Sequence, residues 1–234
     1  KRRMLELCKG DIAKHSGRSK GKVGRIFDEI PAQLQRHEKK FQFSKLGNSA
    51  RYRDYADALF WLKEAMLVNI CTNTTEPNVG LKMKEDSASI KCYLGDTGLL
   101  ISQAFDENEL AAEDIHRRLL FDKIELNEGM LMENVVAQML AATGRTLYFY
   151  SSSDRNDSSN RMEIDFLISN SKIRRRKNIS PIEVKSGKNY TITSLSKFCT
   201  KFNAYLNTLY VLHVKDLEIK NGIVYLPLYM TPLL

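Results

Sequence analysis

The sequence predicts a mixed α/β protein, and three features carry that prediction. Several long stretches repeat apolar residues every three or four positions, as amphipathic helices do. Shorter segments, most clearly 162–168 and 179–186, alternate apolar and polar residues with the period of two that is typical of strands. A hydrophobic content of 43% over 234 residues is enough for one or two domains with a buried core.

Positive charge is concentrated near the N-terminus. The net charge is +8, and residues 1–45 hold thirteen Lys and Arg against five Asp and Glu, so the rest of the chain is neutral. A basic segment of this kind indicates a polyanionic partner, or an acidic docking face on another protein module.

Composition also excludes several classes of protein. The four cysteines are widely separated and form no C-x-x-C pair, which indicates reduced thiols. There is no H-E-x-x-H motif, which argues against a zinc enzyme. The longest apolar tail, 223–234, is too short for a bilayer and contains two prolines. We therefore expect a cytoplasmic protein without a membrane segment.

The N-terminal region is predicted to be helical. Residues 1–9 form a first helix that Gly10 ends, and Asp11 caps a short turn after it. Residues 19–36 form a longer helix that Pro31 bends or divides. Three basic residues lie largely off its apolar stripe, where a solvated face or a phosphate-contacting face would place them: Lys20, Lys22 and Arg25.

From Phe41 onward the pattern resembles a winged helix. A helix over 51–68 is followed by a strand at 67–70, and a second strand at 90–94 would complete a β-wing. Arg51 and Arg53 stand at the start of this helix, the element that enters the major groove in DNA-reading modules of this type. Winged helices also dock other proteins, so both interpretations remain open.

The second module is predicted to begin near Glu125. Asp96 and Thr97 cap a short helix, and a connecting helix over 106–118 follows it. The remaining elements are a helix at 128–142, strands at 147–151, 162–168 and 179–186, a helix at 194–205, and strands at 209–214 and 223–226. We therefore predict a basic region over 1–103, a connection over 104–124 and an α-β-β-β-α-β domain over 125–234.

Charged residues on two of these strands point to chemistry. The alternation places Glu163 and Asp165 on one face of the first strand, with Ile164, Phe166 and Ile168 on the other. On the second strand it places Glu183 and Lys185 together. Mg²⁺ prefers carboxylate oxygens and usually takes one or two protein carboxylates.

We therefore predict a metal-dependent phosphodiesterase site with Mg²⁺ or Mn²⁺ as cofactor, in which Asp165 and Glu183 are the metal ligands. Lys185 would orient a water or offset charge on the phosphate. The plain alternative is a structural ion pair, because strands often carry alternating charges that pair across a sheet. Between the two strands, Arg174, Arg175 and Arg176 are candidates for contacts to a nucleic-acid backbone.

The combination of Asp165 with Glu183-Val184-Lys185 resembles the PD-(D/E)XK motif of the restriction-endonuclease-like superfamily. That superfamily often places a further acidic residue on its first core helix, and Glu133 occupies the matching position in the helix 128–142. The resemblance implies a mixed sheet flanked by helices and assigns Glu133 the role of an auxiliary acid.

More closely, the chain resembles the C-terminal region of a family of prokaryotic AAA+-type ATPases. The likeness covers nearly the whole sequence, and five segments carry it: 30–34, 93–100, 129–134, 163–168 and 181–187. No G-x-x-x-x-G-K-[ST] phosphate loop occurs, so this chain cannot bind ATP in that family's way. Because it starts at Lys1, we expect an excised C-terminal piece whose partner is the missing N-terminal ATPase module.

Three functions follow from this reading. The first is nucleic-acid binding with metal-dependent phosphodiester cleavage, with DNA as the partner. The second is a catalytically inactive docking or assembly module, in which the charged set forms an ion-pair network. The third is DNA binding without cleavage, which strongly salt-dependent affinity would indicate. The sequence is also compatible with an oligomer.

Overall fold

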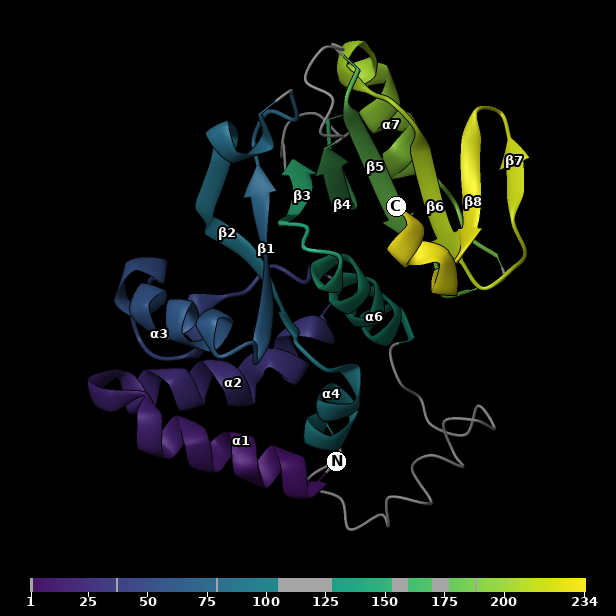
Figure 1. Ribbon diagram of the computed structural model, residues 1–234. Helices are drawn as coiled ribbons and strands as arrows, with labels where there is room; N and C mark the ends of the chain where they lie inside the picture. Colours follow the sequence, from purple (N-terminus) through teal and green to yellow (C-terminus); the bar gives the residue numbers. More distant parts are fainter. Residues whose placement is uncertain are drawn as a thin grey trace.

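The computed structural model describes residues 2–36, 38–78, 80–104, 128–152, 160–169, 177–187 and 189–234. Within these ranges, helices at the N-terminus precede an eight-stranded mixed sheet with further helices against it (Figure 1). This confirms the predicted α/β class. No helix in the described ranges has both the length and the apolar character needed to cross a bilayer. The predicted connecting helix and Arg174, Arg175 and Arg176 lie outside the described residues.

The helices follow the predicted pattern closely. Their bounds are α1 Arg2–His15, α2 Lys20–Leu34, α3 Tyr52–Glu64, α4 Thr97–Ala104, α6 Glu128–Ala142 and α7 Thr193–Phe202, with a final 3₁₀ segment η5 at Leu228–Leu233. The prediction for α6 is confirmed at both ends. The Asp96 cap is confirmed as well, because its carboxylate accepts a hydrogen bond from the Leu99 N–H at 2.8 Å.

The strands form one sheet in the order β2-β1-β3-β4-β5-β6-β8-β7. Their bounds are β1 Val68–Thr74, β2 Glu85–Leu94, β3 Leu147–Ser152, β4 Met162–Ser169, β5 Ile179–Val184, β6 Leu209–His213, β7 Glu218–Lys220 and β8 Ile223–Pro227. Pairing is parallel for β1 with β3, β5 with β6 and β6 with β8, and antiparallel for the others. The predicted order α-β-β-β-α-β is confirmed from α6 to β6.

The first helix differs from its prediction. Gly10 does not end it, because α1 continues to His15. Glycine inside a helix costs about 1 kcal/mol relative to alanine. Leu5 and Ile12, on either side of Gly10, are both buried against the neighbouring helices, and their burial outweighs that cost.

Pro31 does not divide α2. Proline has no N–H to donate to the carbonyl four residues earlier, which here belongs to Phe27. The side-chain amide of Gln103 on α4 donates a hydrogen bond to that carbonyl at 2.8 Å. A tertiary contact thus replaces the helical hydrogen bond, so α2 continues to Leu34.

The two strands expected to form a β-wing do pair as an antiparallel hairpin, and both are longer than predicted. They do not stand apart from the second module, however, because β1 also pairs with β3 in the common sheet. Figure 1 shows β2 and β1 continuing the sheet on the side of the N-terminal helices. The sheet therefore runs across the predicted boundary between the two modules.

Two apolar cores cover opposite faces of the sheet. Alternate residues of β3 enter different cores: Leu147 and Phe149 pack with α6 and the N-terminal helices, whereas Tyr148 and Tyr150 pack with α7. Helix α6 contacts both β1 and β5, so it crosses the middle of the sheet (Figure 1). A polar group on the sheet-facing side of α6 is thereby held above the central strands.

A β-bulge interrupts β4 beside the predicted site. Tyr148 is paired with Leu167 and Tyr150 with Ile164, so β4 carries one more residue than β3 over this interval. The bulge reverses the alternation: Ile164 lies in the core under α7, whereas Phe166 lies in the core under α6. The prediction that these two residues share a face is therefore wrong, because strict alternation ignores an inserted residue.

Buried hydrogen bonds fix α6 on the sheet. The Asn134 side chain accepts from the Leu94 N–H at 2.9 Å and donates to the Leu94 carbonyl at 3.1 Å. Gln138 accepts from both the backbone and the hydroxyl of Thr97 at 3.0 Å. A side chain at Gly95 would place its Cβ 2.4 Å from the Met66 carbonyl oxygen, so only glycine fits between these contacts.

Candidate active site

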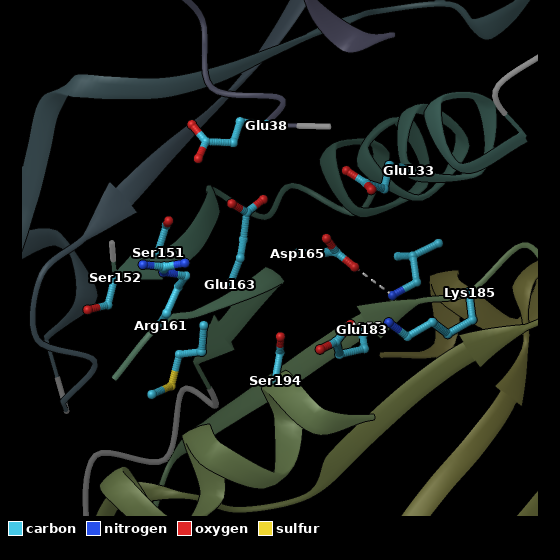
Figure 2. A pocket seen from close by; sticks show the side chains of 12 residues that line it. Glu38, Glu133, Ser151, Ser152, Arg161, Glu163, Asp165, Glu183, Lys185 and Ser194 are labelled. Carbon is cyan, nitrogen blue, oxygen red and sulfur yellow. Dashed lines mark hydrogen bonds and ion pairs between the residues drawn. The ribbon is translucent and has the colours of Figure 1, made fainter. Parts of the chain in front are cut away.

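A cavity of about 700 Å³ lies where β3, β4 and β5 meet α6. Figure 2 shows Glu133, Asp165 and Glu183 with Lys185 toward one end of this pocket, and Arg161 beside two serines at the other. Its lining consists of Glu38, Glu133, Ser151, Ser152, Arg161, Met162, Glu163, Asp165, Glu183, Val184, Lys185 and Ser194. The four residues predicted to be catalytic are therefore brought together, as the sequence indicated.

Asp165 lies in the bulge of β4, where the pairing with β5 ends. That pairing runs from Ser169 with Ile179 to Phe166 with Ile182, and the next residues along the two strands are Asp165 and Glu183. One carboxylate oxygen of Asp165 accepts a hydrogen bond from the Val184 N–H at 2.8 Å (Figure 2). Burial, together with the charge of Glu133, raises the pKa of Asp165 to about 7.

Glu183 and Lys185 form an ion pair at 2.8 Å between Oε2 and Nζ. The other oxygen of Glu183, Oε1, is buried and has no hydrogen-bond partner among the described residues. Burial raises the pKa of Glu183, since the Lys185 charge only partly compensates for lost hydration. For Lys185 burial alone would lower the pKa, but Glu183 outweighs burial and raises it, so the side chain stays cationic.

Glu133 is held differently, because protein donors reach both of its oxygens. Lys39 pairs with Oε1, while the Tyr93 hydroxyl donates to Oε2 at 3.0 Å. Lys91 Nζ lies 3.7 Å from the same Oε2. Burial alone would raise the pKa of Glu133, but Lys91 and Lys39 outweigh it and lower the pKa. Glu133 is also buried on the sheet-facing side of α6.

Lys91 was not predicted as a site residue, although its side chain is fully buried beside the acids. Its Nζ lies 2.7 Å from Glu163 and 3.7 Å from Asp165, and it stands over the ring of Phe149. The three carboxylates raise its pKa even though burial alone would lower it. The sequence signal is a single cation inside the apolar run 90–94, since a buried lysine needs a partner of opposite charge.

The acids thus fall into two groups. We call Asp165 and Glu183, the two adjacent acids of β4 and β5 whose pKa values are raised, the carboxylate pair. We call Lys39, Lys91, Glu133 and Glu163 the lysine cluster, because each acid there is paired with a lysine. Three of its four members, Lys39, Lys91 and Glu163, like Glu38 and Arg161 of the lining, were missed as site residues at the sequence level.

Two family models match the chain, and they divide it between them. Residues 1–109 match the model described as Domain of unknown function (DUF8612). Residues 128–230 match Domain of unknown function (DUF4143). DUF4143 is found in AAA-ATPase-associated proteins, which agrees with the predicted relation to that class. No curated protein and no solved structure matches the chain.

The pocket draws on both matched regions. The carboxylate pair, Lys185, Glu133 and Glu163 belong to the DUF4143 region, whereas Lys39, Lys91 and Tyr93 come from the DUF8612 region. Each contact that neutralises Glu133 therefore joins the two regions. The site depends on both parts of the chain, whose predicted division at residues 103 and 125 stays a prediction.

The donor set sets limits on metal binding. Among the residues that the structure describes, no three His, Cys, Asp or Glu side chains are arranged to hold a metal ion. The carboxylate pair is the part of the DUF4143 region that fits a hard cation, because the buried Oε1 of Glu183 has no hydrogen-bond partner among the described residues. Two carboxylates completed by water and phosphate oxygens are the usual protein share of a Mg²⁺ site.

The basic residues predicted to contact nucleic acid lie elsewhere. None of the basic residues predicted on α2 or at the start of α3 is among the described residues that line the pocket. The Lys22 ammonium donates to the Asp54 carbonyl at 2.5 Å, and the Arg25 guanidinium lies 3.5 Å from the Leu46 carbonyl, so both also hold α2 against neighbouring segments. Lys20, Arg51 and Arg53 are exposed and stay candidates for phosphate contacts.

Proposed function

We propose that this chain hydrolyses phosphodiester bonds in nucleic acid, with Mg²⁺ or Mn²⁺ held by Asp165 and Glu183. The observation that carries the proposal is the buried Oε1 of Glu183, which has no hydrogen-bond partner among the described residues and lies in the same pocket as Asp165. A buried carboxylate oxygen without a donor is costly, and a bound cation removes that cost. Burial is the main cause of the raised pKa of both acids, so both ionised carboxylates would gain from a nearby cation.

The fit to a hard cation is chemical as well as electrostatic. Each member of the carboxylate pair gives one oxygen to a close protein donor, Val184 N–H or Lys185. The other oxygen of Glu183 has no hydrogen-bond partner among the described residues, and the other oxygen of Asp165 has only Lys91 near it, at 3.7 Å. When bound, a divalent ion acidifies a coordinated water and polarises the phosphate. The cavity of about 700 Å³ falls within the range of roughly 300–1,000 Å³ that is usual for ligand pockets.

The chain's own residues have distinct roles in this proposal. Hydrolysis adds a water oxygen to phosphorus and releases an ester oxygen that takes up a proton, so negative charge develops on the phosphate oxygens. Lys185, cationic and paired with Glu183, is placed to stabilise that charge. Glu133 positions Lys39 and Lys91, because protein donors already reach both of its oxygens; its predicted part as an auxiliary acid is untested.

In this proposal, basic residues outside the pocket bind the nucleic acid. The exposed Lys20, Arg51 and Arg53, together with Arg174 to Arg176, are proposed to contact the phosphate backbone of DNA. Replacing the first three with alanine should weaken DNA binding uniformly across sequences and flatten its salt dependence. Fluorescence anisotropy at several salt concentrations measures both quantities, and an unchanged slope argues against these contacts.

A plasmid nicking assay tests the proposed activity. Wild-type protein should cleave with Mg²⁺ or Mn²⁺ and stop when EDTA is added. Asp165→Asn, Glu183→Gln and Lys185→Ala should each slow cleavage roughly 100-fold or more. Glu218→Gln and Lys220→Ala, which change the same residue types on the exposed strand β7, should cleave at the wild-type rate. No cleavage by wild type, or equal cleavage by Lys185→Ala, contradicts the proposal.

One observation favours a second candidate, a docking or assembly module of an AAA+-type ATPase without catalysis. Lys91 already neutralises part of the acidic site from within the protein, as an ion-pair network would. This candidate predicts no divalent-metal affinity and a marked loss of stability when Asp165 or Glu183 is replaced. Calorimetric titration with Mn²⁺, combined with urea unfolding of both variants, separates the two candidates.

A further inference from the structure

The ammonium group of Lys91 lies among three of the carboxylates that line the pocket, those of Glu133, Glu163 and Asp165. It stands on β2, has no exposed side-chain surface, and reaches toward carboxylates from two other elements, α6 and β4. A buried ammonium is stable only with partners of opposite charge. Neither DNA binding nor the proposed cleavage uses this residue.

The surroundings of Lys91 are those of a bound cation. Carboxylate oxygens approach its Nζ at 2.7 Å from Glu163 and at 3.7 Å from both Glu133 and Asp165. The Phe149 ring adds a further favourable contact, with its centroid 5.1 Å away. Oxygens from several carboxylates around one positive centre are also what a divalent ion requires.

Asp165 contacts both the Lys91 ammonium and the strand β5 that carries Glu183. One of its oxygens faces Lys91 and the other accepts the Val184 N–H, while Glu183 pairs with its own lysine. With Lys91 present, Glu133, Glu163 and Asp165 surround an ammonium group and are not arranged to hold a metal ion. Without Lys91, these three acids would lose that positive charge and would be free to close around an ion beside Glu183. Neighbouring groups of acids hold two ions in two-metal phosphodiesterases.

We propose that Lys91 is a resident cation that fills the position of a second divalent ion, so that the pocket binds a single ion between Asp165 and Glu183. This inference rests on the proposed function, because it requires the carboxylate pair to bind metal. It assigns Glu163 and Glu133 to Lys91 as counter-ions and removes them from the metal ligands.

Calorimetric titration of the full chain with Mn²⁺ tests the stoichiometry. Wild-type protein should bind one ion per chain, and Lys91→Met should bind two, because the change removes the charge but keeps much of the side-chain volume. Lys39→Met is the matched control. It takes a positive charge from Glu133 without touching Glu163 or Asp165, and it should still bind one ion.

A second variant avoids any dependence on how well Lys91→Met folds. Glu163→Gln retains Lys91 and lies at the partly exposed edge of the lysine cluster. It should bind one Mn²⁺ with an affinity less than about tenfold below wild type, because Glu163 is not a ligand. Loss of binding in this variant would overturn the proposal.

The outcomes distinguish this inference from the proposed function. Two ions in wild-type protein, or one ion in folded Lys91→Met, overturn the role of Lys91. One ion in wild type and two in Lys91→Met support it, even if plasmid DNA is not cleaved and the proposed function fails. Absence of Mn²⁺ binding in wild type and in every variant overturns both.

Discussion

The two ends of the pocket treat buried carboxylates in opposite ways. In the lysine cluster, Glu133 forms ion pairs with Lys39 and Lys91 and accepts a hydrogen bond from the Tyr93 hydroxyl. The two lysines lower its pKa. In the carboxylate pair, Asp165 and Glu183 have fewer donors, and their pKa values are raised. A buried carboxylate whose oxygens all have protein donors stabilises the fold, whereas one that lacks a donor is stabilised when a cation binds to it.

The largest expected effect is on folding, at the lysine cluster. Glu133→Ala should lower the free energy of unfolding by about 3–5 kcal/mol, because it leaves two lysines without their shared acid. Glu133→Gln should cost less, since the amide still accepts the Tyr93 hydrogen bond. Urea unfolding measures both variants. If the alanine variant is as stable as wild type, Glu133 does not hold the two matched regions together.

The next effect is on activity, at the carboxylate pair. Asp165→Asn should slow plasmid nicking roughly 100-fold or more while the protein keeps or gains stability in EDTA, because a costly buried charge is removed. Asp216→Asn, a matched change at an exposed position, should leave both quantities unchanged. A large loss of stability in Asp165→Asn would place Asp165 with the structural acids and remove the contrast between the two ends.

The contrast also predicts a pH dependence. The pKa of Asp165 is about 7 in the folded protein against an ordinary value of 3.8, so the folded state binds more protons between these values. The stability from this group is complete below about pH 4 and is lost as the pH rises through 7. Relative to Asp165→Asn, metal-free wild type should lose more than about 1 kcal/mol over that interval.

Thermal unfolding in EDTA buffers from pH 4 to pH 8 measures this difference between wild type and Asp165→Asn. Added Mn²⁺ should reduce it, because a bound cation favours the ionised carboxylate. A difference that grows in favour of wild type as the pH rises would show that Asp165 is ionised and paired in the metal-free protein.

The smallest expected effect is the loss of stability when a hydrogen bond, but no charge, is removed from the lysine cluster. Tyr93→Phe removes the hydroxyl that donates to Glu133 and should lower the free energy of unfolding by about 1–2 kcal/mol. Because Tyr93 does not reach the carboxylate pair, Mn²⁺ affinity should stay at the wild-type value. A change in affinity above about tenfold would indicate that the two ends act as one unit.

Much of the fold could be predicted from periodicity, because burial on one face imposes it. The apolar arc of α6 gave its bounds correctly, and alternation gave β3, β4 and β5. Strand β7 escaped detection, since three exposed residues have no buried face to mark them. The helix α1 was cut short at Gly10 because local propensity cannot report the tertiary burial of Leu5 and Ile12.

The candidate site was predictable only where its residues are close in the sequence. Glu183 and Lys185 are two positions apart, and Asp165 lies on the preceding strand, so spacing was sufficient. Lys91 lies far from its partner Glu163 along the chain, and their contact exists because β1 pairs with β3. The bulge at Asp165 was hidden for a similar reason, since a bulge is defined against the neighbouring strand.

The hydrogen bonds between Asn134 and Leu94 and the parallel pairing of β1 with β3 both join the N-terminal region to the C-terminal region. This arrangement suggests that the protein could be divided into two fragments that associate. Residues 1–104 and 128–234 could be produced as two polypeptides, each bearing one side of an interface that combines these hydrogen bonds with a shared apolar core. Mixed in solution, they should reassemble without a covalent link, and Lys91 and Glu163 would meet only in the reconstituted complex. Formation of the complete site would then report that the two fragments have associated.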